Sequence, residues 1–453
     1  MGLLQPIFTI LILAVVLLVR SLKATHVPRF YFPTSPLLLQ VKRKNHLENG
    51  HSSNGDARQI NGNGDAHGNK YDLMGINAFL RSRVPSLFEG YRPTWWLALG
   101  HLQTIFVVVG DFSKVDKVTY ERTLIRTPDG GTLGLDLCPP PAQAPELPED
   151  TPIIVVQTGL TGGSFEAYLR TILARACASK ADGGLGFRGI VVNFRGCAGV
   201  PLTSPQLYSA GHTEDLRSAV LYIADKYPKA PLHGLGFSIG ANILTRYLGE
   251  EGEGSRLSSG VTLACAWDTA KNSWRLENEF IPKTFYAKAL GGNFLSVFTR
   301  HLDRILQFPP DERLTPHIPD ILKLKNPTLL DVDHVLTKYI GGSSPPFPFE
   351  TPEKYCKYLG SEPPLDHRRF AFPYLAINAA DDPIVGFVPT VETQKSSTCA
   401  LAVTPSGGHL GWFHGGDWFG RPDRWIRQPV LEWLAAVGED YVPGSELKRE
   451  ARM

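Results

Sequence analysis

A serine between two glycines is the group in this chain of 453 residues whose setting most clearly suggests covalent chemistry. Residues 236–240 read GFSIG, which places Ser238 at the centre of a G-x-S-x-G pattern. Where this pattern joins a strand to a helix, the serine sits on a sharp, strained turn that presents its hydroxyl as a nucleophile. A chain with 44 glycines meets so short a pattern by chance quite often, so Ser238 needs partners elsewhere in the sequence.

A serine hydroxyl is a weak nucleophile that needs a base, and the base needs an acid to orient it. With this turn, the order along the chain is serine, then aspartate or glutamate, then histidine. YLAINAADDPIVG places Asp381 and Asp382 just after an apolar run, and CALAVTPSGGHLGWF places His409 just after the next one. We predict Asp382 as the acid because it directly precedes Pro-Ile-Val, which leaves Asp381 as a turn or solvated neighbour.

Acyl transfer also needs two backbone N–H groups that hold the oxygen anion formed during the reaction. Ile239, directly after the serine, supplies one of them. The segment IIVVQTGLTGGS places Gly159 and Leu160 at the end of an early apolar run. We predict the Leu160 N–H as the second donor, with a plain glycine turn as the alternative reading of this segment.

These groups need a scaffold that brings the ends of strands together. Short apolar runs alternate with stretches of helical spacing, and the runs are 153–156, 189–193, 232–237, 261–266, 374–378 and 400–404. Runs without polar alternation are typical of parallel strands covered on both faces, and sites form at the carboxyl ends of such strands. A β-hairpin with its turn at 128–131 precedes them. The sequence therefore predicts an α/β fold with a mostly parallel sheet flanked by helices.

The predicted alternation is interrupted between residues 267 and 370, a stretch rich in proline and aromatic residues. We interpret this stretch as a cap-like insertion over the sheet, which would form an acyl pocket within a catalytic domain at 71–445. Residues 45–70 contain almost nothing apolar and cannot bury a core, so they predict a disordered linker.

The amino terminus carries an uncharged apolar run, residues 3–19, which as a helix would be about 26 Å long. That length is at the short end of what spans a bilayer, with a buried core helix as the alternative. No basic residue precedes the run and no cleavage site follows it, which argues against a signal peptide. Basic residues after the run predict a single-pass anchor at 1–24 with the catalytic domain facing the cytosol, on the endoplasmic reticulum, a lipid droplet or the mitochondrial outer membrane.

Composition argues against several other classes of protein. A net charge of +2, without a block of clustered basic and aromatic residues, makes no case for nucleic acid as a partner. The six cysteines are scattered without a C-x-x-C pair, so neither a zinc site nor a disulfide framework is predicted. We expect no metal and no organic cofactor.

Seven segments, in order along the chain, resemble one branch of the α/β-hydrolase superfamily, the AB hydrolase family 4 type. They are GHLQTIF (100–106), TGLTGGS (158–164), VVNFRGCAG (191–199), YSAGHTEDL (208–216), GFSIGANIL (236–244), INAADDPIV (377–385) and GGHLGWF (407–413). The branch includes fungal medium-chain fatty acid ethyl ester synthase/esterases, monoacylglycerol lipases, membrane-anchored abhydrolases and bacterial esterases. Val200 departs from the family pattern, which more often has a small polar residue there, and His101 belongs to a family segment without a mechanism.

The resemblance implies the family's catalytic roles for Ser238, Asp382 and His409. It also implies a serine esterase or acyltransferase that acts through an acyl-enzyme on medium-chain fatty acyl esters. The acyl donor would be an ester, a monoacylglycerol or acyl-CoA, and the acceptor would be water or an alcohol such as ethanol. Two alternatives stay open: a peptidase or phospholipase on the same fold, and a catalytically inactive α/β-hydrolase fold that binds a ligand.

Overall fold

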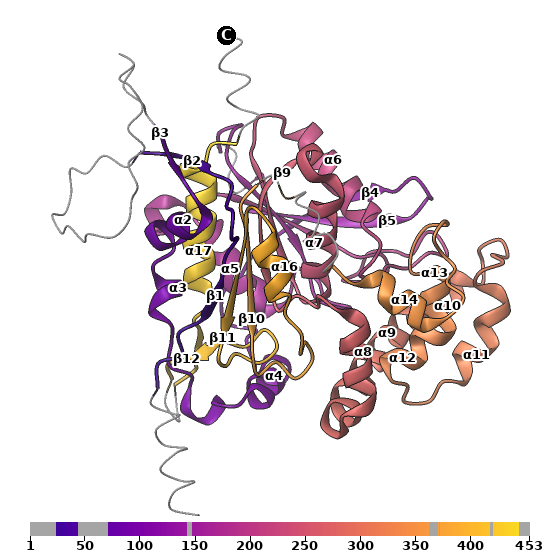
Figure 1. The fold of residues 1–453 in the computed structure, drawn as a ribbon. Coiled ribbons are helices and arrows are strands. Elements are labelled where there is room, and N and C mark those ends of the chain that lie inside the picture. The colour runs from indigo at the N-terminus through magenta and orange to yellow at the C-terminus, as the bar shows by residue number, and fades with distance from the viewer. Residues whose placement is uncertain are drawn as a thin grey trace, which may run out of the picture.

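The computed structural model describes residues 24–43, 71–142, 147–361, 370, 372–416 and 420–443. A nine-stranded sheet runs through them in the order β1-β11-β10-β9-β8-β6-β7-β5-β4 (Figure 1). Its strands are β1 (Arg29–Tyr31), β4 (Glu121–Arg126), β5 (Thr132–Cys138), β6 (Ile153–Gln157), β7 (Arg188–Asn193), β8 (Leu232–Phe237), β9 (Leu257–Leu263), β10 (Tyr374–Ala379) and β11 (Cys399–Thr404).

The centre of the sheet is parallel, as the sequence predicts. The six predicted apolar runs correspond to β6 to β11, and each of these strands pairs in parallel with its neighbours of the same group. The predicted hairpin is β4 and β5, and β5 pairs antiparallel with β7. Strand β9 begins four residues before its predicted run. It ends at Leu263, because the next residue, Ala264, has a φ of 53° and turns the chain out of the sheet.

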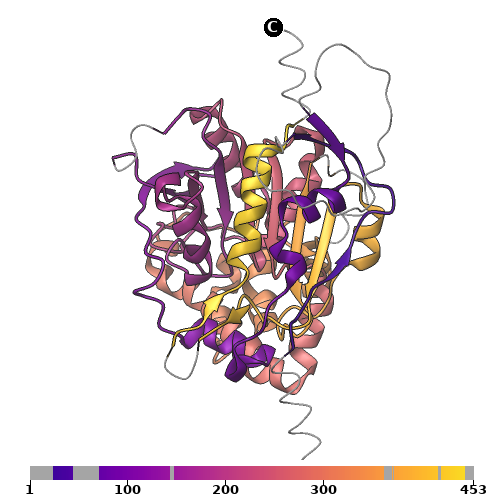
Figure 2. The same cartoon turned by 90° about the vertical axis from the view of Figure 1, so that its left-hand side faces the viewer.

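Helices cover both faces of the sheet (Figure 1), and Figure 2 looks onto the face that α17 (Arg427–Ala435) covers. One core packs one side of β5 to β11 against α2 (Ile76–Arg83), α5 (Ala167–Ala176) and α17. The other core packs the opposite side against α6 (Glu214–Lys226) and α7 (Ile239–Glu251). In β6, Ile154 and Val156 enter the first core while Ile153 and Val155 enter the second, as the two-residue period of a strand requires.

A group of helices lies between β9 and β10, beyond one end of the sheet (Figure 1). The elements used below are α8 (Thr269–Asn278), η4 (Pro282–Ala287), α9 (Lys288–Arg300), α12 (Leu329–Val332), η6 (Asp333–Thr337) and α14 (Pro352–Leu359). Their buried side chains, such as Phe294 and Leu336, join the core that contains α6 and α7. These helices therefore pack directly against the side of the fold that carries α6 and α7 rather than forming a separate unit.

Two short segments near the amino terminus belong to the fold, although the sequence analysis assigned no element there. Strand β1 pairs antiparallel with β11 at the edge of the sheet. Strand β2 (Leu39–Lys42) pairs antiparallel with β3 (Tyr71–Met74), so the chain returns to the same place after the predicted linker. Strands of three or four residues carry too few positions for a periodic signal. The predicted linker, residues 45–70, lies outside the described residues.

The predicted single-pass membrane anchor is corrected by the structure. A helix that crosses a bilayer needs about 20 consecutive apolar residues. Within the described ranges no helix has the length and apolarity to do so, and the longest α-helices there, α6, α7 and α9, have 13 residues each. Residues 1–23, on which the prediction rests, lie outside the described residues. The membrane localisation predicted from this anchor is therefore withdrawn.

Candidate active site

Ser238 occupies a sharp turn between β8 and α7, as the G-x-S-x-G pattern predicts. Its backbone angles, φ of 54° and ψ of −118°, are strained for a residue with a side chain. A Cβ on Gly236 would lie 2.7 Å from Ala241 Cα, and one on Gly240 would lie 2.3 Å from the Thr158 carbonyl oxygen. The two glycines are therefore required by the close approach of neighbouring backbone, and that approach holds the serine in its turn.

Ser238, His409 and Asp382 form one chain of hydrogen bonds. His409 Nε2 lies 2.8 Å from Ser238 Oγ, and His409 Nδ1 lies 2.8 Å from Asp382 Oδ2. The other carboxylate oxygen, Asp382 Oδ1, accepts the N–H groups of Ile384 and Val385 at 2.8 and 2.9 Å. An ionised carboxylate only accepts hydrogen bonds, so His409 Nδ1 donates to Asp382. Nε2 is then free to take the proton of Ser238.

Asp381 has a separate role beside this chain. Its Oδ1 accepts the N–H of Gly408 at 2.9 Å, which fixes the residue that precedes His409. Burial raises the pKa of the Asp381 carboxyl to about 6. The prediction of Asp381 as a turn or solvated neighbour did not include this contact. It could not be read from the sequence, because it joins two loops whose approach depends on the packing of β10 beside β11.

Helix α4 (Gly100–Val109) holds the histidine loop from the other side. Thr104 Oγ1 accepts the backbone N–H of His409 at 2.8 Å, and its hydroxyl donates to the Gly100 carbonyl oxygen at 2.7 Å. Gln103 Oε1 accepts the N–H of Phe413 at 3.0 Å. In the sequence, GHLQTIF provides only a resemblance. A buried Thr-Gln pair within a mainly apolar helix is the signal that could have pointed to a positioning role.

Removing the Thr104 hydroxyl should impair catalysis without removing a catalytic group. In Thr104→Val the side chain keeps its shape, but the buried N–H of His409 loses its acceptor and the imidazole is no longer held in place. We expect kcat for a p-nitrophenyl ester to fall about 10- to 100-fold. Thr104→Ser keeps the hydroxyl and should stay close to wild type. Equal rates in the two variants would contradict this role.

His101 lies on the same helix but outside the hydrogen-bonded chain. Its Nδ1 is 2.8 Å from the Tyr286 hydroxyl, and the two rings are stacked with centroids 5.7 Å apart. Burial raises the pKa of Tyr286 to about 12, with a smaller contribution from the Asp382 charge, so the phenol stays protonated at neutral pH. His101 therefore joins α4 to η4 of the cap-like helices, which is a structural contact.

The loop after β6 is held by two tyrosine hydroxyls. Tyr168 Oη accepts the N–H of Gly159 at 3.0 Å, and Tyr208 Oη accepts the N–H of Thr161 at 2.9 Å. Leu160 lies between these fixed groups and lines the pocket beside Ser238. In the described part of the chain the Leu160 N–H has no acceptor of its own. The arrangement leaves this N–H available to a ligand, together with that of Ile239 in the first turn of α7.

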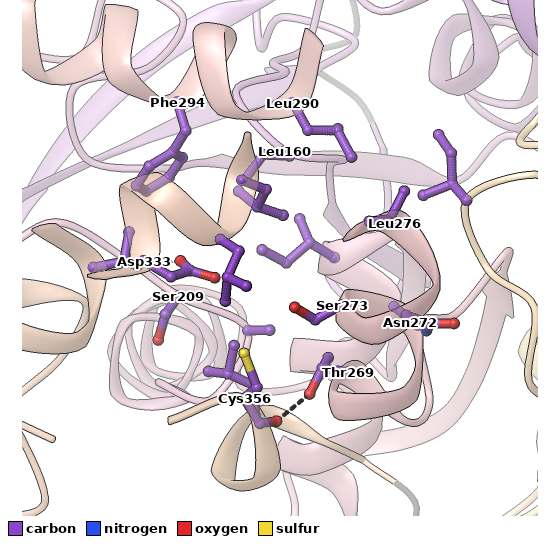
Figure 3. A pocket seen from close by; sticks show the side chains of 18 of the residues that line it. Leu160, Ser209, Thr269, Asn272, Ser273, Leu276, Leu290, Phe294, Asp333 and Cys356 are labelled. Atoms are coloured by element: carbon purple, nitrogen blue, oxygen red, sulfur yellow. Dashed lines mark hydrogen bonds between the residues drawn. The ribbon is translucent and has the colours of Figure 1, made fainter. Parts of the chain in front are cut away.

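Ser238 opens into a pocket that encloses about 930 Å³ of space, part of it open to solvent. Most of its lining side chains are apolar, and they come largely from α8, α9, α12 and α14: Leu276, Leu290, Phe294, Leu329, Leu330 and Leu359. Figure 3 shows Leu160, Leu276, Leu290 and Phe294 pointing into the same space (Figure 3). A mainly apolar pocket that opens beside the serine suits a fatty acyl chain.

The VVNFRGCAG segment supports the scaffold rather than the pocket. Arg195 is 2% exposed, and its guanidinium binds Asp215 at 2.6 Å and Asp129 at 2.5 Å, which ties the β4–β5 turn to α6. Val200, the departure from the family pattern, is buried against Gly134, where a Cβ would lie 2.6 Å from the valine. A glycine opposite the larger side chain accommodates the change.

Within the described ranges no group of three or more His, Cys, Asp or Glu side chains is placed to hold a metal ion. The six cysteines are buried, and none of them forms a disulfide.

Comparisons with known proteins identify relatives of this chain. The family described as alpha/beta hydrolase fold matches residues 152–413. The chain is 29% identical over 408 residues to a monoacylglycerol lipase of Saccharomyces cerevisiae, covering 82% of this chain and 86% of that protein. It is 27% identical to medium-chain fatty acid ethyl ester synthase/esterase 2 of the same yeast, covering 81% and 91%. It is 29% identical to human phospholipase ABHD3, covering 75% and 78%.

Proposed function

We propose, from the premise that this chain belongs to the alpha/beta hydrolase fold family and is a lipid or ester hydrolase, that it cleaves medium-chain fatty acyl esters through an acyl-enzyme on Ser238. The observation that carries the proposal is the Ser238–His409–Asp382 chain of hydrogen bonds at the wall of an apolar pocket. The pocket supports an acyl chain as the bound group, and the serine supports an acyl-enzyme.

In the first half of the reaction, Ser238 Oγ attacks the carbonyl carbon while its proton moves to His409 Nε2. The carbonyl oxygen becomes an anion that accepts the N–H groups of Leu160 and Ile239. The bond to the alcohol oxygen then breaks, and the imidazolium gives its proton to the departing alkoxide. Asp382 stabilises the imidazolium throughout and stays ionised.

In the second half, His409 takes a proton from the acceptor, whose oxygen attacks the acyl carbon, and it gives that proton to Ser238 Oγ as the bond between the acyl carbon and the serine breaks. Water as acceptor yields the free fatty acid, and an alcohol such as ethanol yields a new ester. The same first step accepts a thioester, so acyl-CoA is a second class of donor. The names of two relatives, a monoacylglycerol lipase and an ester synthase/esterase, support hydrolysis and alcohol transfer, respectively.

Labelling with a fluorophosphonate probe tests the nucleophile directly. The probe forms a covalent bond to an activated serine, so the wild type should be labelled and Ser238→Ala should not be. His409→Ala should be labelled far more slowly, because the serine loses its base. Equal labelling of wild type and Ser238→Ala would overturn the assignment.

The substrate is tested by competition against that probe. Monoacylglycerols and p-nitrophenyl esters of graded chain length should protect Ser238, with medium chains protecting best. Protection by a phospholipid or a peptide, and none by these esters, would favour the phospholipase or peptidase alternative. Adding ethanol to the turnover assay separates hydrolysis from alcohol transfer through the product formed.

A further inference from the structure

One wall of the pocket carries polar side chains that the proposed mechanism does not use. Asp333 and Thr337 come from η6, Ser209 precedes α6, and Tyr355 comes from α14, and all four line the cavity. Figure 3 shows Asp333 and Ser209 on one side of the pocket, below Phe294 (Figure 3). A carboxyl group buried in an apolar pocket costs free energy unless it has a partner.

The Asp333 carboxyl has one oxygen in use. The Thr337 hydroxyl donates a hydrogen bond to Asp333 Oδ1. The other oxygen, Oδ2, makes neither a hydrogen bond nor an ion pair with any described residue. The hydroxyl of Ser209 is also buried and makes no hydrogen bond with a described residue, although the Tyr355 side chain lies close to it. Two polar groups on this wall are therefore available to a ligand.

Burial raises the pKa of the Asp333 carboxyl to about 7. The titratable groups that face it are Tyr355 and Cys356 of α14, and burial raises the pKa of both, that of Cys356 to about 12. Lys338, the cation one turn further along, donates to the Glu350 carbonyl oxygen instead. Since no cation among the described residues pairs with it, the Asp333 carboxyl keeps its proton in mildly acidic solution and carries an O–H donor.

Asp333 and the Asp382 loop lie on different sides of the pocket. Helix α8 packs against the Asp382 loop, because Asn272 Oδ1 accepts the Gly386 N–H at 3.1 Å and Arg275 donates to the Asp382 carbonyl oxygen at 3.2 Å. Figure 3 shows Asp333 across the pocket from Asn272. We place the departing alcohol, which takes its proton from His409, near the Asp382 loop, so that the acyl chain runs past Leu276 toward Asp333.

Building on the proposed function, we propose that Asp333 and Ser209 form a polar subsite that binds an oxygen atom carried on the fatty acyl chain. The O–H of Asp333 donates to an oxo, hydroxyl or ether oxygen of the chain, and the apolar side chains around it hold the remaining carbons. A plain chain leaves this buried donor without a partner, which weakens its binding. The pocket therefore selects oxygen-bearing medium-chain acyl esters over plain ones.

A matched pair of substrates tests this selection. The probes are p-nitrophenyl octanoate and a positional series of p-nitrophenyl oxo-octanoates, whose ketone oxygen only accepts hydrogen bonds. For wild type at about pH 6, we expect kcat/KM of the best oxo ester to exceed that of octanoate about tenfold. The ratio should fall as the pH rises through about 7, because ionised Asp333 no longer donates. An effect of pH on the catalytic groups acts on both esters and cancels in the ratio.

Variants separate a binding role from a structural one. Asp333→Asn keeps a donor that does not titrate, so its preference should persist at every pH. Asp333→Leu removes the donor and should cleave octanoate at least as well as the oxo ester. The proposal is overturned if the wild-type ratio of kcat/KM for the oxo ester to that for octanoate is near one across the positional series, or if it does not change with pH. This test uses the wild type, so it holds even where Asp333→Leu fails to fold.

Binding without turnover distinguishes this proposal from the function on which it rests. With Ser238→Ala, oxo-octanamide should raise Tm more than octanamide does, and the added Asp333→Leu change should abolish that difference. If the fluorophosphonate probe does not label Ser238 in the wild type, the result counts against the catalytic proposal alone. Normal labelling with equal Tm shifts for the two amides would count against the polar subsite alone.

Discussion

Replacing Asp382 with asparagine should lower kcat about 10⁴-fold while the protein stays folded. The N–H groups of Ile384 and Val385 point at Oδ1, so the amide oxygen takes that position and the NH₂ group faces His409. His409 Nδ1 must then accept a hydrogen bond, which leaves the proton on Nε2. An imidazole in that tautomer cannot take the proton of Ser238. The measurement is kcat for p-nitrophenyl octanoate, with Tm as the check on folding.

The neighbouring aspartate provides a control that differs by one position in the chain. In Asp381→Asn the amide oxygen still accepts the N–H of Gly408, so the histidine loop keeps its support. We expect kcat to fall by less than about tenfold, the cost of a weakened hydrogen bond. Similar losses in the two variants would contradict the assignment of Asp382 as the acid that orients His409.

Replacing Arg195 with methionine should lower the free energy of unfolding by about 3–5 kcal/mol. The change leaves the carboxylates of Asp129 and Asp215 without their cation, and Asp215 is 8% exposed. Urea unfolding at neutral pH measures the loss. Lys180→Met is the matched control, since its ion pair with Glu439 is 71% and 44% exposed and should be worth less than about 1 kcal/mol.

The effect of Arg195→Met on the free energy of unfolding should depend on pH. Burial raises the pKa of Asp129, but the hydrogen bonds and charge of Arg195 outweigh burial and hold this pKa below its ordinary value. A lowered pKa contributes stability above the ordinary aspartate pKa of about 4, and this contribution is lost as the pH falls further. The difference between wild type and Arg195→Met should therefore be full at neutral pH and shrink in acid. A difference that does not change with pH would exclude this ion pair as its source.

Much of the α/β scaffold could be predicted because burial leaves a local pattern in the sequence. The apolar runs of β6 to β11 lack polar alternation, which indicates strands that are covered on both faces. The turn at Ser238 could be predicted for a related reason, since Gly236 and Gly240 mark where backbone leaves no room for a side chain. A local pattern has limits, however. An uncharged apolar run predicted a membrane anchor that the structure does not support, and strand β1 was too short to leave any pattern.

The sequence by itself determined which chemistry we propose for this chain, through the order of a serine, an acid and a histidine at strand ends. The tertiary structure decided which atoms of those residues meet, and which groups hold them. Thr104 supports His409 across 305 positions of the chain, and Asp382 rather than Asp381 reaches the imidazole across 27. The physical reason is that residue spacing records which face of an element is buried, whereas the partner of a side chain depends on how distant elements pack.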